Sequence, residues 1–175
     1  MKENCWTKTL LGTYRYLENI AGAIDKMVMK TALNSYHFCR GESNNVYNIS
    51  NKIIDLADRK ITLINLKVII DKVLMEIPES DAKLLIERYV ENVKCRVMAE
   101  NSKVSIRTLF RKLTCAENNF TKKLVANGYT DARLSELLKK EKWILNFYDQ
   151  VANKGEENLN MQKDLAYQTK IFGLV

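Results

Sequence analysis

Apolar residues recur at helical spacing along most of the chain, and the first long pattern covers residues 7–38. Its apolar positions follow one another at steps of three or four residues: Leu10, Tyr14, Leu17, Ala21, Ile24 and Val28. Such steps place the side chains on one face of an α-helix. The pattern predicts one long helix, and Gly41 in the polar segment 40–46 can end it.

A second long pattern begins at residue 46 and is close to the heptad repeat of a coiled coil. Its apolar positions are Val46, Ile49, Ile53, Leu56, Leu63, Ile70, Leu74 and Ile77. Lys60 and Lys67 occupy two positions of the same register, and Ile61, Ile64 and Val68 widen the apolar stripe beside them. The pattern predicts a second long helix that packs either against the first, as an antiparallel hairpin, or against a second copy of the chain.

Pro78, the only proline, marks a boundary after the second helix. Its ring removes a backbone donor and restricts the preceding residue, so a helix ends there. Ser80 or Asp81 can cap a third helix over residues 81–92, whose acidic first turn suits a helix N-terminus. The positions expected to be buried in this helix are Leu84, Leu85, Tyr89 and Val90.

The next segment has the pattern of two helices joined by a tight turn at residues 102–104. The inner face of the short first helix is expected to consist of Val97, Met98 and Ala99. Ser105 can cap the second helix. The inward positions of that helix are Leu109, Leu113, Ala116, Phe120 and Leu124. A helix-turn-helix needs a small residue where its helices cross and an apolar residue at the turn, and Ala99 and Val104 meet these requirements.

The outer face of the second helix carries the residues expected to contact DNA. A helix-turn-helix protein places the N-terminal turns of this helix in the major groove. Arginine makes bidentate bonds to guanine, and the threonine methyl packs on thymine. The predicted base-contacting residues are Ile106, Arg107, Thr108 and Arg111. Phosphate contacts add affinity without sequence information, and are predicted for Lys94, Arg96, Lys103, Ser105 and Lys112.

The charge distribution favours the same stretch as a surface for a polyanion. The chain has a formal net charge of +7, from 28 basic and 21 acidic residues. Residues 92–123 hold eight basic residues against two acidic ones, whereas residues 129–175 hold seven of each. This local excess suits DNA, and the alternative interpretation is a solvated basic face of a helical bundle.

Residues 88–120, RYVENVKCRVMAENSKVSIRTLFRKLTCAENNF, resemble region four of bacterial sigma factors. The resemblance lies in the arginine-tyrosine pair, in Ala99 six residues before Ser105, in the S-x-x-T spacing that follows and in a later alanine. Over about residues 44–125, the arrangement is similar to phage and prophage transcriptional regulators of the ArpU and RinA kind.

The resemblance implies a sequence-specific DNA-binding regulator of transcription, of the phage or prophage type, whose partners are double-stranded DNA and RNA polymerase. No sigma region two is recognisable, so a complete sigma factor is not expected. The chain departs from the family at the turn, where Ser102 and Lys103 replace the usual leucine and glycine. It departs again before Ala99, where Val97 and Met98 stand in place of an acidic residue.

The C-terminal part is expected to hold one more helix and a tail. Asn127 and Gly128 can end the preceding helix as a left-handed cap, and Thr130 or Asp131 can begin the next, over residues 131–153. Its expected buried positions are Leu134, Leu137, Leu138, Trp143 or Ile144, and Phe147 or Tyr148. The aromatic face completes the core of the module or binds another protomer.

Catalytic, metal and nucleotide sites find no support in the sequence. The four cysteines, Cys5, Cys39, Cys95 and Cys115, lack C-x-x-C spacing, so free buried or half-buried thiols are expected. His37 lies near Cys39, but without a third catalytic group it is interpreted as a helix-end residue. No glycine-rich nucleotide-binding motif occurs. We therefore expect no enzyme, metal or cofactor.

Targeting signals are likewise not recognisable. No apolar run reaches the roughly 18 residues of a membrane span, and residues 1–19 lack the apolar core and cleavage site of a signal peptide. The sequence predicts a cytoplasmic protein with no membrane partner.

The patterns together predict an all-α protein, in keeping with one proline and six glycines in 175 residues. Its expected parts are a long helical hairpin for packing or dimerisation at 1–77, the sigma-region-four-like helix-turn-helix at 78–128, and the C-terminal helix and tail at 129–175. A homodimer is expected because one small module rarely supplies enough base contacts.

The alternative function is a helical protein-interaction or assembly module, such as a small terminase-like packaging subunit. Oligomeric state separates these hypotheses. A ring of many copies favours packaging, a dimer favours regulation, and a monomer with a free hydrophobic patch favours a protein partner.

Overall fold

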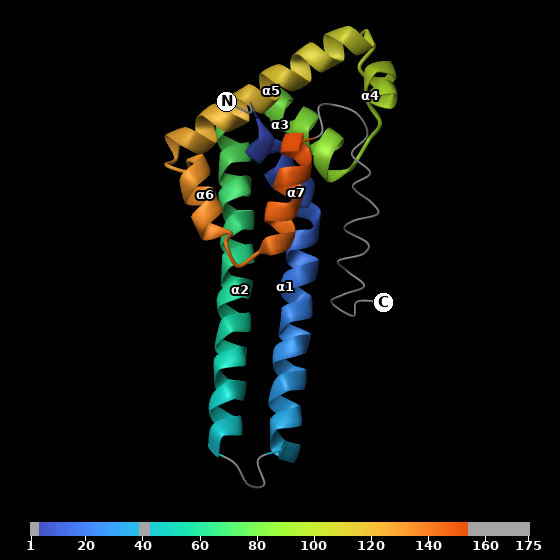
Figure 1. The fold of residues 1–175 in the computed structure, drawn as a ribbon. Helices are drawn as coiled ribbons and strands as arrows, with labels where there is room; N and C mark the ends of the chain where they lie inside the picture. The colour runs from blue at the N-terminus through green and yellow to red at the C-terminus, as the bar shows by residue number, and fades with distance from the viewer. Residues whose placement is uncertain (1–3, 39–42, 154–175) are drawn as a thin grey trace. The chain divides into compact units, whose positions relative to one another are not determined.

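The computed structural model describes residues 4–38 and 43–153, and all regular structure in them is helical (Figure 1). The elements of these residues, in chain order, are α1 (Cys5–Phe38), α2 (Ser43–Glu76), α3 (Glu79–Leu85), the π-helical segment η1 (Ile86–Val90), α4 (Cys95–Asn101), α5 (Ile106–Ala126), α6 (Asp131–Leu137) and α7 (Lys142–Asn153). The predicted all-α fold is confirmed.

The described residues form two compact units. The first consists of residues 4–15 and 67–153, and the second of residues 16–38 and 43–66. Helices α1 and α2 each contribute one segment to each unit. The boundaries at residues 77 and 128 stay a prediction.

Helix α1 follows its predicted apolar face, and α2 does so in part, because Leu56, Leu63 and Ile70 are buried whereas Val46 is 49% exposed. In α1, Leu10, Leu17, Ala21 and Ile24 are buried, while Tyr14 and Val28 are half-buried. Helix α2 begins at Ser43, so the connection is shorter than the turn predicted over residues 40–46. Gly41 lies outside the described residues, as do Cys39 and the side chain of His37.

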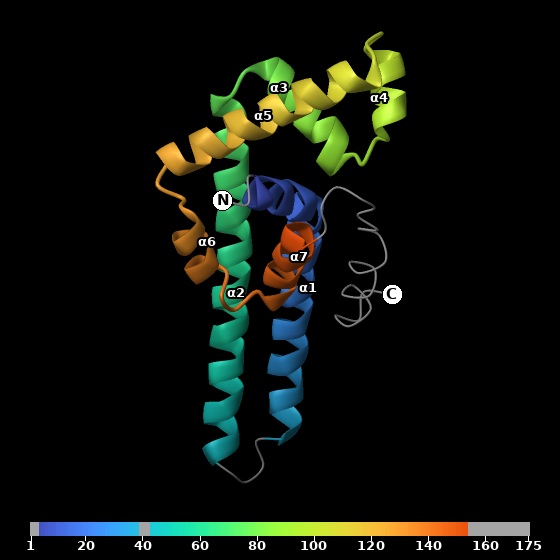
Figure 2. The same cartoon turned by 45° about the horizontal axis from the view of Figure 1, so that its top comes forward.

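The second unit is a pair of antiparallel helix segments, which lie side by side in Figures 1 and 2. Its buried apolar residues are Leu17, Ile20, Ala21, Ala23, Ile24, Leu56, Leu63 and Leu66. The Lys60 ammonium donates to both carboxylate oxygens of Asp25, at 2.7 and 2.8 Å. Within the second unit, the predicted apolar face of α2 therefore packs against α1 of the same chain.

Another apolar set on α2 does not join that buried face. Ile61 is 55% exposed, and Ile64 and Val68 are also exposed. Ile61 precedes the buried Leu63 by two residues, which corresponds to about 160° around a helix. These residues therefore lie off the face of α2 that packs against α1, and their packing against a second copy of the chain stays a prediction.

The first unit buries a core to which six of its helices contribute: Leu10, Leu11, Ile70, Val73, Leu85, Phe120, Leu124, Leu134, Leu138, Ile144 and Phe147. Trp6 stacks on Tyr148 with ring centroids 4.3 Å apart, and Cys5 is buried with Phe147 and Val151. The C-terminal aromatic face thus packs against the start of α1, which lies outside the module whose core it was expected to complete.

The segment expected to form one C-terminal helix is divided into α6 and α7. The Thr130 hydroxyl caps α6 by accepting the Arg133 N–H. Before α7, the buried Glu141 turns inward and its carboxylate accepts the Trp143 indole N–H at 2.9 Å. The Glu141 carbonyl accepts the Ile144 N–H at 2.9 Å, so the chain starts a new helix there.

Helix α3 also differs from its expected form. It begins after Pro78 with no side-chain cap, so Ser80 and Asp81 do not cap it. Asp81 instead accepts a bond from the Asn119 amide of α5, at 2.7 Å. The Glu91 N–H donates to the Ile86 carbonyl, which is the i to i+5 bond of a π-helix. Leu85 and Tyr89 are buried. Helix α3 packs along α5, as Figure 2 shows.

Candidate nucleic-acid interface

Helices α4 and α5 are joined by a Schellman turn at residues 102–104. The Val104 N–H donates to the Ala99 carbonyl at 3.0 Å, and the Lys103 N–H to the Glu100 carbonyl at 3.1 Å; this is the bonding pattern of that motif. Lys103 has a φ of 52°, in the left-handed region that glycine usually occupies. The predicted tight turn is confirmed, with Lys103 in the glycine-like conformation.

A small apolar cluster holds α4 against α5. Met98, Ala99 and Leu109 are buried in it, and Val104 packs against them. Val97 is 41% exposed because it lies one residue, or about 100° of helix, from Met98. The expectation that Val97 belongs to the inner face is wrong, whereas all the predicted inward positions of α5 are buried.

The first turn of α5 is fixed by a cap between two hydroxyl residues. The Ser105 hydroxyl accepts the Thr108 backbone N–H at 3.1 Å, and the two side-chain oxygens lie 2.8 Å apart. The predicted N-cap is confirmed. Both hydroxyls are therefore engaged within the protein.

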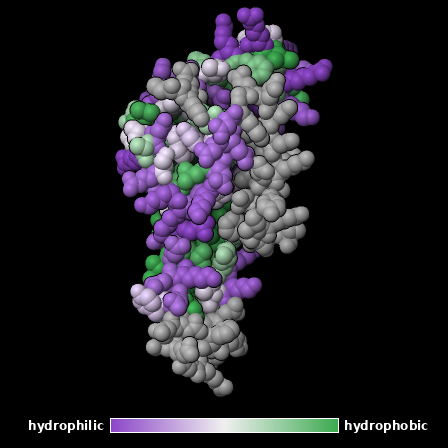
Figure 3. All heavy atoms as spheres, viewed as in Figure 1, coloured by the Kyte–Doolittle hydropathy of each residue, from purple (hydrophilic) through white to green (hydrophobic). Residues whose placement is uncertain are grey.

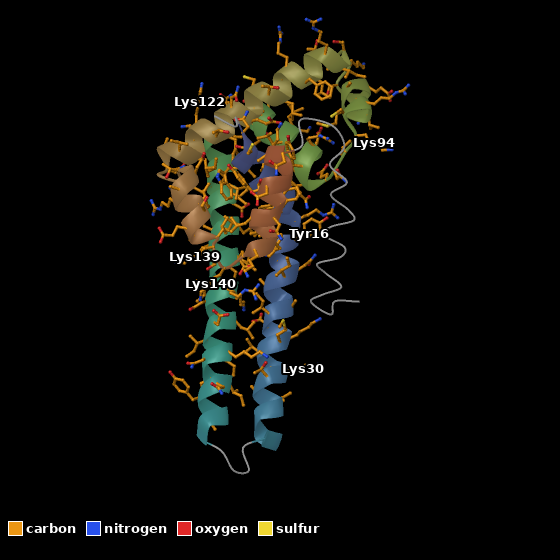
Figure 4. The ribbon with its side chains drawn as sticks, viewed as in Figure 1. Tyr16, Lys30, Lys94, Lys122, Lys139 and Lys140 are labelled. Atoms are coloured by element: carbon orange, nitrogen blue, oxygen red, sulfur yellow. The ribbon has the colours of Figure 1, made fainter. Side chains whose placement is uncertain are left out.

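The structure places the predicted base-contacting residues at the start of α5, where Ile106, Arg107 and Arg111 are exposed and Thr108 is half-buried. The cations predicted to hold phosphates are also exposed: Lys94, Arg96, Lys103 and Lys112. Arg96 is paired with Glu100 at 3.2 Å. Figure 4 shows Lys94 at α4 and Lys122 toward the other end of α5. The DNA contacts themselves stay predictions.

The one acidic residue of α5, Glu117, is withdrawn from its surface. Glu117 is 5% exposed, accepts the Tyr89 hydroxyl and lies 3.7 Å from the Lys8 ammonium. Burial, and then the nearby Glu117 carboxylate, raise the pKa of Tyr89, so its hydroxyl remains a donor to Glu117. The charged residues left exposed on α5 are consequently all cations.

Three exposed residues of α5 were not among the predicted DNA contacts, although the charge count over residues 92–123 includes two of them. Lys122 and Lys123 extend the basic surface beyond the first turns, and Phe110 is 51% exposed. The signal for Phe110 was available, since it stands one residue after Leu109 and therefore lies off the inward stripe.

A second candidate surface lies on α2 within the second unit. Tyr47, Ile54 and Ile61 are exposed at seven-residue intervals, with Ala57 and Ile64 exposed between and after them. Apolar residues at these a and d spacings form the seam of a coiled coil. We call these five residues the α2 seam.

The other candidate features of the described residues are metal ligands, free thiols and membrane-spanning helices. No group of three or more His, Cys, Asp or Glu side chains in them could hold a metal ion. Cys5 is buried and Cys95 half-buried as expected, whereas Cys115 is exposed; all three are free thiols. Among the described helices, none has both the length and the apolar character needed to cross a membrane.

No model of a known protein family, no curated protein and no solved structure matches this chain. Function is therefore inferred from the geometry of the two surfaces.

Proposed function

We propose that the chain is a sequence-specific DNA-binding regulator of transcription, of the phage or prophage type, in which α5 enters the major groove. The observation that carries this proposal is the charge of α5, whose single carboxylate is buried while its exposed charges are all positive. Such a surface attracts the phosphate backbone. The resemblance to sigma factor region four supports the same assignment and adds RNA polymerase as a proposed partner.

The roles follow from position on α5. Arg107 and Arg111 are one turn apart and exposed, so each can form a bidentate bond to guanine. Ile106 and Thr108 flank them at the first turn. Cations at the turn and on α4 hold phosphates on either side, which fixes the docking position without selecting sequence.

A homodimer completes the proposal, with the α2 seam as its interface. Ile54 and Ile61 lie at successive a positions, the spacing at which two helices pack along a coiled-coil seam. A two-fold protein would bind two half-sites and gain the base contacts that one module lacks.

Selection from a randomised duplex library tests this function. The expected result is one enriched sequence that binds at least about 10³-fold more tightly than its scrambled form at physiological salt. Equal binding to all duplexes, lost as salt rises, would reduce α5 to a general basic face.

The α2 seam also favours the second candidate function, an assembly module such as a small terminase-like packaging subunit. Light scattering of the full chain separates the two. A dimer supports the regulator, and a closed ring of many copies supports packaging.

A further inference from the structure

Two large apolar side chains stand in the basic surface of α5. Phe110 is 51% exposed and Ile106 is 48% exposed, and they are neighbours because they are four residues apart on one helix. Arg107 lies three residues before Phe110 and Arg111 directly after it. Figure 3 shows apolar side chains gathered near the α4–α5 connection, with hydrophilic side chains projecting beside them.

Phe110 lies outside the apolar cluster that joins α4 and α5. That cluster is built from Met98, Ala99 and Leu109. Single exposed apolar residues are common on proteins. An adjacent aromatic and β-branched pair on the first two turns of a helix whose exposed charges are all cations is a patch suited to cover by a ligand.

We propose that Phe110, supported by Ile106, packs on the 5-methyl group of a thymine in the bound duplex, which makes the protein selective for sites with thymine at that position. This inference rests on the proposed DNA-binding function. The occupant is duplex DNA because the neighbouring Arg107, Arg111 and Lys112 give the patch the positive surroundings that attract a polyanion, and apolar contact with the thymine methyl is an established form of base recognition.

Thr108 is less suited to this role. Its hydroxyl is held against the Ser105 hydroxyl at 2.8 Å in the helix cap, and its side chain is half-buried. Phe110 offers the larger exposed apolar surface next to both arginines.

The test uses the duplex enriched from the randomised library and copies in which single thymidines are replaced by deoxyuridine, which removes only the methyl group. We expect wild-type protein to bind one such copy about four-fold more weakly, the effect of one buried methyl. Phe110→Ala should bind the thymidine duplex about ten-fold more weakly and should no longer distinguish thymidine from deoxyuridine at that position. Phe110→Leu should restore part of the discrimination.

Val125→Ala is the matched control, because Val125 is 49% exposed but lies near the far end of α5. It should retain the wild-type response to deoxyuridine. Equal binding of all deoxyuridine copies by wild-type protein overturns the inference while the DNA-binding function stands. Equal losses in wild type and Phe110→Ala overturn it too, since another residue then contacts the methyl. If no sequence is enriched at all, the proposed function itself fails.

Discussion

The outer face of α5 and the α2 seam both expose large apolar side chains, but their charged surroundings differ. Near Phe110 the adjacent charges on α5 are Arg107 and Arg111, with no exposed acid on the helix. Near Ile61 both signs occur, and Lys60 is already paired with Asp25. The first environment suits a polyanion and the second, with its heptad spacing, suits another helix. The charge around an exposed apolar patch therefore says more about its partner than the exposure does.

The largest expected effect is on the proposed dimer. Ile61→Glu removes an apolar contact in each protomer and places a carboxylate in the seam. Burial of one isoleucine contributes about 1.5–3 kcal/mol, so two-fold symmetry predicts a dimer weakened by about 3–6 kcal/mol. Sedimentation equilibrium of the full chain measures this change.

The control for that experiment is Met29→Glu, which changes another exposed residue of the second unit outside the α2 seam. It should leave the dimer intact. A dimer that survives Ile61→Glu, or one that Met29→Glu dissociates equally, would show that the α2 seam is not the interface.

The next effect compares two phenylalanines on the same helix. Phe120 is fully buried, so Phe120→Ala should lower the free energy of unfolding by about 3–5 kcal/mol. Phe110→Ala should change it by less than about 0.5 kcal/mol, as expected for a surface substitution. Urea unfolding of both variants checks the difference. A large loss of stability in Phe110→Ala would assign that residue to packing instead of binding.

A smaller effect concerns sequence preference. Arg107→Ala or Arg111→Ala should cost about 1–3 kcal/mol on the enriched duplex and relax the preference at one base pair. Lys112→Ala is the control, and it should weaken binding to all duplexes alike. If both arginine variants keep the wild-type sequence preference, α5 does not contact base edges through these residues.

The long periodic helices and the α4–α5 pair were predictable because each depends on local spacing. The inward positions of α5 and the Ser105 cap are examples. Other features depend on contacts that spacing does not encode. The break between α6 and α7 arises where Glu141 turns inward to the Trp143 indole, and Asp81 bonds to Asn119 across helices instead of capping its own.

The basic surface of α5 was likewise only partly predictable from local spacing. Its cations could be identified by counting charges, but the burial of Glu117 beneath the Tyr89 hydroxyl is a long-range contact over 28 residues. The folded chain thereby withdraws the one carboxylate of α5 from the exposed surface of that helix. The purely positive surface could thus be recognised only in the folded chain.

The smallest expected effect separates the two roles of Lys103, as a turn residue and as a cation. Its φ of 52° is unfavourable for a residue with a Cβ, so Lys103→Gly should raise the free energy of unfolding by about 1 kcal/mol. The same change removes a proposed phosphate contact, so binding to every duplex should weaken. The slope of log binding constant against log salt concentration should become shallower by about 1. Urea unfolding and salt titrations measure the two effects.

Lys103→Ala removes the charge but not the strain, so it should weaken DNA binding equally without a gain in stability. If Lys103→Gly binds DNA as wild type does, Lys103 acts only in the turn. A gain in stability from glycine together with equal losses of affinity in both variants would instead place the turn at the DNA backbone. Because stability and affinity would then change in opposite directions on one substitution, a general loss of folding would be excluded as the cause of weaker binding.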